Sequence, residues 1–153
     1  MGVNTDWIRQ CQQAIVGLDT APLIYYIEEH PHYLKVVDPF FDALDRGEFT
    51  VITSTVTLLE VLVQPLRSGE TALIGEYKDI LLHAPNVTIF DMNPAIAEKA
   101  SKLRADYRLR TPDAIQIATA LHEGASFFVT NDVRLPEIQP LQMLVLDELI
   151  KGS

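Results

Sequence analysis

The sequence has little of several features that mark particular classes of protein. It contains one cysteine, Cys11, so no disulfide can form within the chain, and no Cys/His spacing typical of a zinc site accompanies it. No basic flank precedes a long apolar run at the N-terminus, and no apolar stretch approaches the roughly 20 residues that span a membrane. Repeats and low-complexity segments are also lacking. We therefore expect a soluble protein of the reducing cytoplasm, in which Cys11 is an ordinary helix residue.

Positive charge is scarce as well. The chain has 12 Lys and Arg but 21 Asp and Glu, which gives a net charge of -9. This charge argues against a general electrostatic affinity for nucleic acid. It does not exclude a nuclease that gathers carboxylates around divalent cations and keeps a local basic face. The 153 residues, 48% of them hydrophobic, fit one globular domain over 1–153, with 1–13 as a short N-terminal helical extension.

Short apolar strands alternate with helical segments along the rest of the chain. The pattern predicts strands at 14–18, 49–53, 87–90, 127–129 and 143–146. Helices are predicted at about 4–13, 23–29, 33–45, 57–63, 69–82, 95–108 and 111–121. Such alternation implies right-handed crossovers and a mainly parallel sheet covered on both faces. The predicted fold class is therefore α/β, a three-layer α/β/α sandwich with about five strands.

The stretch 111–121, TPDAIQIATAL, has the signals of a helix start. Thr111 can cap, Pro112 suits the first helical position, and Asp113 falls in the first turn. By itself Asp113 is explained by the positive end of the helix dipole. The small side chains of this helix would let it lie close to the sheet: Ala114, Ala118 and Ala120.

Three further acidic residues stand where parallel strands end or just beyond. Asp19 ends the first strand, Asp132 follows the fourth, and Glu60 lies among apolar residues in the helix after the second. Ligands of open parallel sheets bind at the carboxyl ends of the strands, so these side chains and Asp113 can meet there. Each also has a simpler explanation: Asp19 as a helix cap, Glu60 at a partly exposed edge, and Asp132 in a turn.

Four clustered carboxylates need a cation, and a buried Glu60 would need a positive partner in any case. Oxygen-rich sites of this kind suit Mg²⁺ or Mn²⁺, which points to phosphoryl chemistry. A haloacid-dehalogenase-type phosphatase would need a second Asp at position 21, where the chain has Ala. A receiver domain would need adjacent acidic residues after the first strand, an Asp after the third and a Lys near the fifth, a pattern that Asp91 alone meets poorly.

The ordered set of motifs resembles the PIN-domain ribonucleases, and among them the VapC-like toxins of type II toxin–antitoxin modules. The resemblance covers about residues 14–146 and rests on four segments: Leu18-Asp19-Thr20, Leu59-Glu60-Val61, Pro112-Asp113-Ala114 with Ala118-Thr119-Ala120-Leu121, and Val129-Thr130-Asn131-Asp132. Two positions depart from the family pattern. Ala21 replaces a small polar residue, which puts a minor hydrogen bond at the metal in doubt, and Leu135 replaces an aromatic residue, which affects local packing.

The resemblance implies a metal-dependent endoribonuclease that cleaves RNA by metal-activated water and leaves a 5′-phosphate. The acidic positions of the family match Asp19, Glu60, Asp113 and Asp132 as ligands of Mg²⁺ or Mn²⁺, and Thr130 matches a supporting hydroxyl. The resemblance also implies a cognate antitoxin and a homodimer. A non-catalytic PIN-like module that binds RNA or protein is the main alternative, because intact ligand residues show capacity and not turnover.

A basic segment precedes Asp113 and is a candidate for phosphate contacts. Its members are Lys99, Lys102, Arg104, Arg108 and Arg110. The alternative is a solvated helix face that pairs with Glu98 and Asp106. An aromatic group earlier in the chain is a candidate for either core or a protein-binding groove, with helices 23–29 and 33–45 as the expected antitoxin surface: Tyr25, Tyr26, Tyr33, Phe40 and Phe41.

Overall fold

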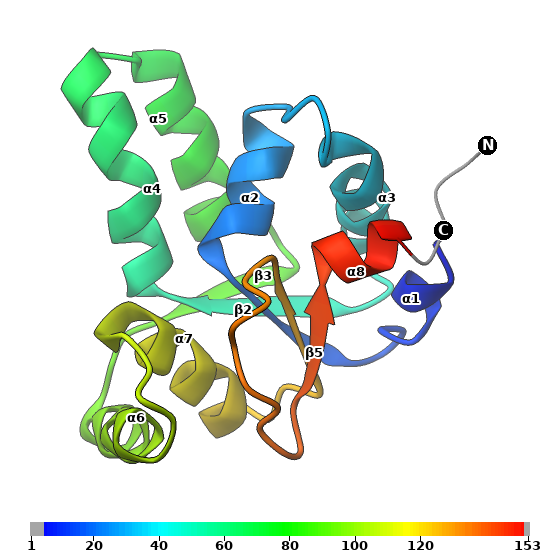
Figure 1. Cartoon of the computed structure of the whole chain (residues 1–153). Helices are drawn as coiled ribbons and strands as arrows, with labels where there is room; N and C mark the ends of the chain where they lie inside the picture. The colour runs from blue at the N-terminus through cyan, green and yellow to red at the C-terminus, as the bar shows by residue number, and fades with distance from the viewer. Residues whose placement is uncertain (1–4, 152–153) are drawn as a thin grey trace.

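The computed structural model describes residues 5–151 and contains a five-stranded sheet in the order β3-β2-β1-β4-β5 (Figure 1). All four strand pairings are parallel. The strands are β1 (Ile15–Leu18), β2 (Thr50–Ser54), β3 (Val87–Phe90), β4 (Phe127–Thr130) and β5 (Gln142–Val145). The predicted α/β class and five parallel strands are confirmed.

Helices cover both faces of this sheet. They are α1 (Asp6–Arg9), α2 (Thr20–Ile27), α3 (Leu34–Asp45), α4 (Thr55–Ser68), α5 (Thr71–Lys78) with its π-helical continuation η1 (Asp79–His83), α6 (Pro94–Tyr107), α7 (Thr111–His122) and α8 (Leu146–Lys151). In Figure 1, α6 and α7 lie below the sheet, whereas α2, α3 and α8 lie above it, with α4 and α5 beside α2. The arrangement is the predicted three-layer sandwich.

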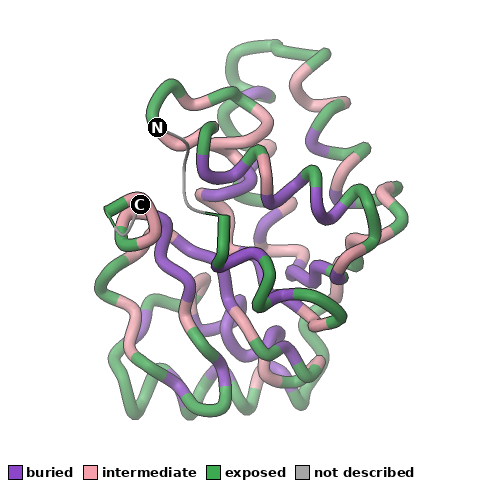
Figure 2. Tube along the Cα trace, turned by 90° about the vertical axis from the view of Figure 1, so that its right-hand side faces the viewer, coloured by how far each residue is buried: buried purple, intermediate pink, exposed green. Residues whose placement is uncertain are grey.

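Two apolar cores form because successive strand residues point to opposite faces. On the α2/α3 side, Val16 and Leu18 of β1 pack with Phe40 and Phe41 of α3, all almost fully buried. On the α6/α7 side the buried residues include Ile52, Phe128 and the small side chains of α7. Figure 2 shows the buried residues gathered in the strands and on the inward sides of the helices.

Gly17 lets α7 approach β1 closely. A Cβ atom built on Gly17 would lie 2.9 Å from Cβ of Ala120 and 2.9 Å from Cδ1 of Phe128, closer than non-bonded carbons can approach. Ala114, Ala118 and Ala120 are almost fully buried, as expected for small residues on a tightly packed helix. Because α7 begins with Asp113 in its first turn, this close packing also sets the position of that carboxylate.

Several element boundaries differ from those predicted. Helix α2 begins at Thr20, three residues early, because Asp19 accepts the cap hydrogen bond. Pro65 does not end α4, which continues to Ser68 and stops at Gly69 with a left-handed φ of 68°. Pro65 costs the helix only one backbone hydrogen bond near its exposed end. Helix α7 has Arg110 at its N-cap and no side-chain cap bond, so Thr111 is not the cap.

The ends of the chain also differ from expectation. Helix α1 stops at Arg9, and Cys11 lies beyond it in a turn, fully buried, where burial raises the pKa of its thiol to about 11. The predicted helix start at Asn4 falls outside the described residues. Helix α8 was not predicted, because 146–151 follows β5 without a linker. Across residues 5–151, every helix is too short or too polar to cross a membrane.

Candidate functional site

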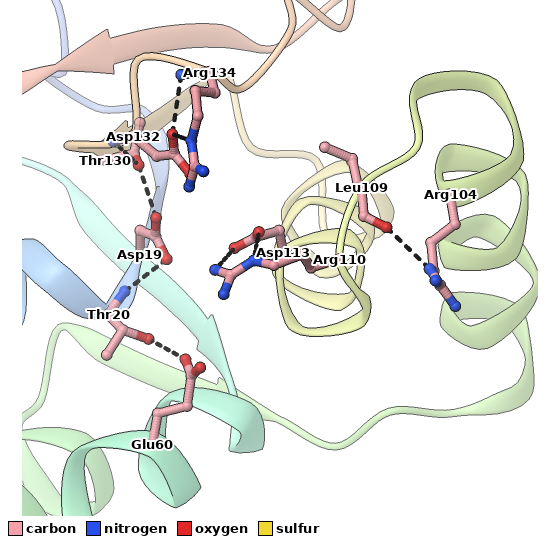
Figure 3. A network of polar contacts seen from close by, with 10 residues as sticks. All are labelled: Asp19, Thr20, Glu60, Arg104, Leu109, Arg110, Asp113, Thr130, Asp132 and Arg134. Atoms are coloured by element: carbon pink, nitrogen blue, oxygen red, sulfur yellow. Dashed lines mark hydrogen bonds and ion pairs between the residues drawn. The ribbon is translucent and has the colours of Figure 1, made fainter.

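A pocket of about 580 Å³ opens at the carboxyl ends of β1 and β4. All four predicted carboxylates line it: Asp19, Glu60, Asp113 and Asp132. They come from the end of β1, from α4, from the first turn of α7 and from the loop after β4 (Figure 3). Asp91, at the end of the edge strand β3, is exposed and does not line the pocket. The four carboxylates are far apart in the sequence, and only the tertiary fold brings them together.

Asp19 is held by two hydrogen bonds. Its Oδ1 accepts from the backbone N–H of Thr20 at 2.8 Å, and its Oδ2 accepts from the hydroxyl of Thr130 at 2.7 Å. Burial is the largest cause of a raised pKa for this carboxyl, opposed by these two hydrogen bonds and reinforced by the charges of Asp113 and Glu60. Asp19 is therefore a helix cap and a pocket residue at once. A cation in the pocket would relieve the repulsion among these carboxylates.

Thr130 couples two of the acidic residues. Its side-chain oxygen donates to Asp19 and accepts the backbone N–H of Asp132 at 3.1 Å. The residue is fully buried, so its hydroxyl has few alternatives. The predicted role of Thr130 in supporting the site is consistent with these two contacts.

Asp113 and Asp132 each pair with an arginine. Nε and Nη2 of Arg110 lie 3.0 and 3.4 Å from the two carboxylate oxygens of Asp113. Nε and Nη2 of Arg134 lie 2.9 and 3.0 Å from those of Asp132, whose Oδ1 also accepts the backbone N–H of Arg134. The Arg134 hydrogen bond is the main cause of a lowered pKa for Asp132. Asp132 is thus a turn residue as well as a pocket residue.

Arg134 was not identified from the sequence. The sequence did contain a signal, because an Asp two residues before an Arg in a loop can form a local turn. In such a turn the Asp carboxylate accepts hydrogen bonds from both the backbone N–H and the side chain of the Arg. The arginine side chains are 69% exposed for Arg110 and 78% for Arg134, whereas the paired carboxylates are only 13% and 20% exposed. The two guanidinium groups therefore lie at the rim of the pocket, with the carboxylates beneath them.

Glu60 is exposed, so its expected burial among apolar neighbours is wrong and the alternative of an exposed edge is correct. The reason is that its neighbours Leu59 and Val63 are themselves 67% and 39% exposed, so this side of α4 faces solvent. Oε1 of Glu60 accepts a hydrogen bond from the hydroxyl of Thr20 at 2.7 Å. The contact directs Glu60 toward the pocket without burying it.

A buried amide connects the elements beneath the pocket. Gln116, 3% exposed in α7, accepts from Ser54 at 3.1 Å and donates to the hydroxyls of Thr57 and, at 3.4 Å, Thr20. These bonds tie α7 to the end of β2, to α4 and to the start of α2. Gln116 was also missed by sequence reasoning. Its signal was a polar residue between Ile115 and Ile117, within the otherwise apolar run 114–118.

A second network holds the loop that carries Asp132. Nδ2 of Asn131 donates to the hydroxyl of Tyr25 at 3.2 Å, and its Oδ1 accepts the backbone N–H of Asp147 at 2.9 Å. Tyr25 stacks on Tyr33 with ring centroids 4.3 Å apart, and Tyr33 donates to Asp147. Part of the predicted aromatic group therefore supports the site.

The remaining members of that aromatic group are mostly core. Phe40 and Phe41 are 1% exposed, and Tyr26 stacks on Phe41 with a centroid distance of 4.0 Å. Tyr26 also lines a hollow between α2 and α3 together with Glu29, Asp38 and other residues. The interpretation as core is correct for the two phenylalanines, while Tyr26 reaches the surface.

The predicted basic segment is not brought together at the pocket. Lys102 pairs with Asp106 at 2.8 Å on α6, and with Lys99 it lines a separate hollow beside α7. Arg104 donates from Nε to the carbonyl of Leu109 at 3.0 Å. Of the five candidates, only Arg110 lines the acidic pocket, and Arg108 lines the hollow next to it. The interpretation as a solvated helix face thus applies to Lys102.

The donor set fits a hard divalent cation in its chemistry, because carboxylate and hydroxyl oxygens are the ligands that Mg²⁺ and Mn²⁺ prefer. Among residues 5–151, however, no group of three or more His, Cys, Asp or Glu side chains is arranged so that it could hold a metal ion. The ion pairs explain part of this, since Arg110 and Arg134 engage both oxygens of Asp113 and of Asp132. Ion binding and these pairs therefore involve the same oxygen atoms.

The raised pKa of Asp19 predicts a pH-dependent cost of folding. A carboxyl whose pKa is higher in the folded than in the unfolded chain stabilises the fold less as the pH rises through that folded-state pKa. Without divalent cations, Asp19→Asn is expected to raise the free energy of unfolding at pH 7, and the gain should shrink as the pH falls through the pKa of Asp19. Urea denaturation of both proteins in EDTA from pH 7 down to pH 4 measures it. A gain that is independent of pH contradicts the assignment.

Comparison with known proteins agrees with this geometry. The sequence profile of the PIN domain matches residues 16–139, so the chain belongs to the PIN domain family. The sequences of curated proteins gave no match.

The solved structures that superpose on this chain include VapBC chains and a VapC toxin. A chain of Rickettsia felis VapBC2, bound to a promoter DNA fragment, superposes with a TM-score of 0.66 at 18% identity, covering 86% of this chain and 98% of its own. A chain of DNA-bound VapBC from Salmonella typhimurium gives 0.62 at 16% identity, covering 88% and 98%. Mycobacterium tuberculosis VapC20, a toxin that cleaves the Sarcin-Ricin loop, gives 0.59 at 18% identity, covering 75% and 87%. The chain is thus a PIN domain with a VapC-like fold.

Proposed function

We propose that this protein is a Mg²⁺- or Mn²⁺-dependent endoribonuclease and the toxin of a toxin–antitoxin pair. The observation that carries the proposal is the meeting of Asp19, Glu60, Asp113 and Asp132, from four separate elements, in one pocket of a PIN domain. Similarity to VapC20, a Sarcin-Ricin loop cleaving toxin, supports RNA as the substrate.

In this proposal Asp19 and Asp113 would hold the cation directly, and Glu60 and Asp132 would hold it directly or through water. A divalent cation bound there supplies charge stabilisation for the scissile phosphate and lowers the pKa of water. Thr130 keeps the Asp19 carboxylate oriented, and Thr20 does the same for Glu60. In-line attack of water on phosphorus then breaks the bond to the 3′-oxygen, which leaves a 5′-phosphate and a 3′-hydroxyl.

The arginines at the rim give the pocket a second function toward the substrate. Each guanidinium has five N–H donors, and the ion pairs with Asp113 and Asp132 use only the Nε and Nη2 groups. Nη1 of Arg110 and of Arg134 is therefore not engaged by these carboxylates. We assign both arginines to the RNA phosphates, which would otherwise be repelled by four carboxylates.

Partner and setting follow from the same proposal. A protein antitoxin would bind the hollow of about 490 Å³ at α2 and α3, whose acidic lining favours a basic segment. A second copy of the chain would cover the exposed apolar strip of α4, formed by Leu59, Val63 and Leu66 at helical spacing. RNA cleavage and a free, buried Cys11 fit the cytoplasm.

The purified chain is expected to cleave single-stranded RNA in Mg²⁺ or Mn²⁺, to leave 5′-phosphate ends and to stop when EDTA is added. Mn²⁺ alone should also raise the melting temperature by mass action, because the ion binds only the folded site. Gel analysis of labelled RNA and thermal denaturation measure the two effects.

The ion pairs of Asp113 and Asp132 favour a second candidate, a non-catalytic PIN-like module, since they satisfy both carboxylates without any ion. RNA that is bound but never cleaved, in either metal, would support the module and contradict the nuclease.

A further inference from the structure

A second hollow adjoins the acidic pocket. It has a volume of about 210 Å³ and shares Arg110, Asp113, Asp132 and Arg134 with the larger pocket. Its remaining lining is different in character: Tyr107, Arg108, Leu109 and Leu135. We call it the side hollow. It is too small for a whole drug-sized ligand and suits a single flat group.

The charge of the side hollow is opposite to that of the acidic pocket. Three arginines line it, Arg108, Arg110 and Arg134, against two carboxylates that two of these arginines already neutralise. The chain as a whole carries a net charge of -9, so this is a local reversal of sign. An RNA phosphate that extends from the acidic pocket into the side hollow would therefore lie near these arginines.

The turn that carries Tyr107 and Arg108 is fixed. Arg108 has a left-handed φ of 57°, and its N–H donates to the carbonyl of Arg104 at 2.9 Å, which closes the end of α6. Arg104 in return donates from Nε to the carbonyl of Leu109, whose side chain is 8% exposed in the core beside α7. The backbone of the turn is thus held from both sides, which lowers the entropy cost of binding there.

Tyr107, the last residue of α6, offers an aromatic ring to a ligand. It is 42% exposed, although most large aromatic side chains of this chain are half-buried or buried. An exposed aromatic ring beside arginines is the combination that single-stranded nucleic acid uses, with bases stacked on the ring and phosphates on the cations. Leu135, partly buried, supplies an apolar contact on the loop side of the hollow.

We propose that the side hollow binds the nucleotide next to the scissile phosphate, with its base on Tyr107 and its phosphate on Arg108. This rests on the proposed ribonuclease function and deepens it, because it assigns the residues that hold the nucleotide beside the cleaved bond. A base reaches Tyr107 only after it has left the helical stack, so RNA in a continuous duplex is a poor ligand.

The test measures binding of a labelled single-stranded RNA by fluorescence anisotropy, in EDTA so that no cleavage occurs. Tyr107→Ala is expected to weaken binding about tenfold, the effect of losing one stacked base, while Tyr107→Phe keeps it. Arg108→Asn should weaken binding and reduce its salt dependence, and Asn tolerates the left-handed backbone. Met92→Ala, an exposed apolar residue outside both hollows, is the matched control and should bind like the unaltered protein.

A double comparison locates the base. RNAs with one abasic nucleotide at successive positions should bind less well to the unaltered protein when the abasic position falls in the side hollow. The Tyr107→Ala protein should bind this abasic RNA as tightly as it binds the intact RNA, because the substitution has already removed the stacking contact. Circular dichroism melting of each variant shows whether it folds, and Tyr107→Phe controls for loss of the aromatic packing.

The outcomes separate this inference from the function on which it rests. If Tyr107→Ala binds RNA as tightly as the unaltered protein, the proposed nucleotide site is overturned, even if the protein cleaves RNA. A tenfold loss that Tyr107→Phe restores, together with no cleavage in Mg²⁺ or Mn²⁺, keeps the nucleotide site and overturns the nuclease. Duplex RNA that binds as tightly as single-stranded RNA also overturns the proposed substrate form.

Discussion

Replacing Asp19 by Asn is expected to lower metal-dependent RNA cleavage by about 100-fold or more, the scale seen when a group that orients or stabilises the reacting centre is lost. The substitution removes the charge and keeps the shape. Asn still accepts the N–H of Thr20 through its side-chain oxygen, so the cap of α2 survives. The buried hydroxyl of Thr130 can rotate to accept from the new amide. Loss of activity therefore reports loss of a ligand and not of the fold.

Asp91→Asn is the matched control for this substitution. Asp91 also follows the last residue of a parallel strand, yet it is exposed and does not line the pocket. Initial rates of RNA cleavage in Mn²⁺, with melting temperatures of all three proteins, provide the comparison. Asp19→Asn with the full rate would refute the metal site, and an equal loss in Asp91→Asn would show a general effect of surface charge.

Gly17→Ala is expected to destabilise the protein by about 1–3 kcal/mol, the usual cost of forcing an extra carbon into a packed core. The new Cβ would lie 2.9 Å from both Ala120 and Phe128, and neither can withdraw easily, since both are almost fully buried. Relief requires α7 to move away from β1. Because α7 carries Asp113 and Gln116, the same variant should also lose cleavage activity.

Gly75→Ala is the opposite case and serves as the control. Gly75 lies inside α5, and nothing lies within 4 Å of the added Cβ. Alanine there should stabilise the helix by about 0.5–1 kcal/mol. Urea denaturation measures both variants, and a shift of midpoint at constant slope identifies a change in stability. If the two substitutions have equal effects, α7 does not lie as close to β1 as described.

The two arginine pairs affect how the proposed cation would bind. Arg110 and Arg134 engage the same carboxylate oxygens that a cation would use, so these ion pairs offset part of the negative charge of the pocket. RNA phosphates offer a negative charge to the two arginines, and a divalent cation offers a positive charge to the two carboxylates. Binding of either one therefore weakens the ion pairs with which the other competes. Metal affinity and RNA affinity are therefore expected to be coupled at this site.

Much of the fold was predictable because its signals are local. Runs such as 14–18 and 127–129 are apolar and end at polar residues, and the helices between them have capping and turn residues at their ends. The boundaries that were wrong depended on other information. Helix α2 begins at Thr20 because Asp19 adopts a capping geometry, and α4 continues past Pro65 until Gly69 adopts a left-handed φ.

The place where the carboxylates of the candidate site meet could be predicted without a structure. Asp19 and Asp132 follow strands and Asp113 begins a helix, and a parallel sheet gathers such positions at one edge whatever the details of packing. The contacts of each carboxylate, in contrast, follow from how the helices and loops pack in the folded chain. The pairing of Arg134 with Asp132 and the approach of Thr20 to Glu60 depend on side-chain directions within a few ångströms. The same holds for Gln116, since residues far apart in the chain come within hydrogen-bonding distance only when the helices are packed on the sheet.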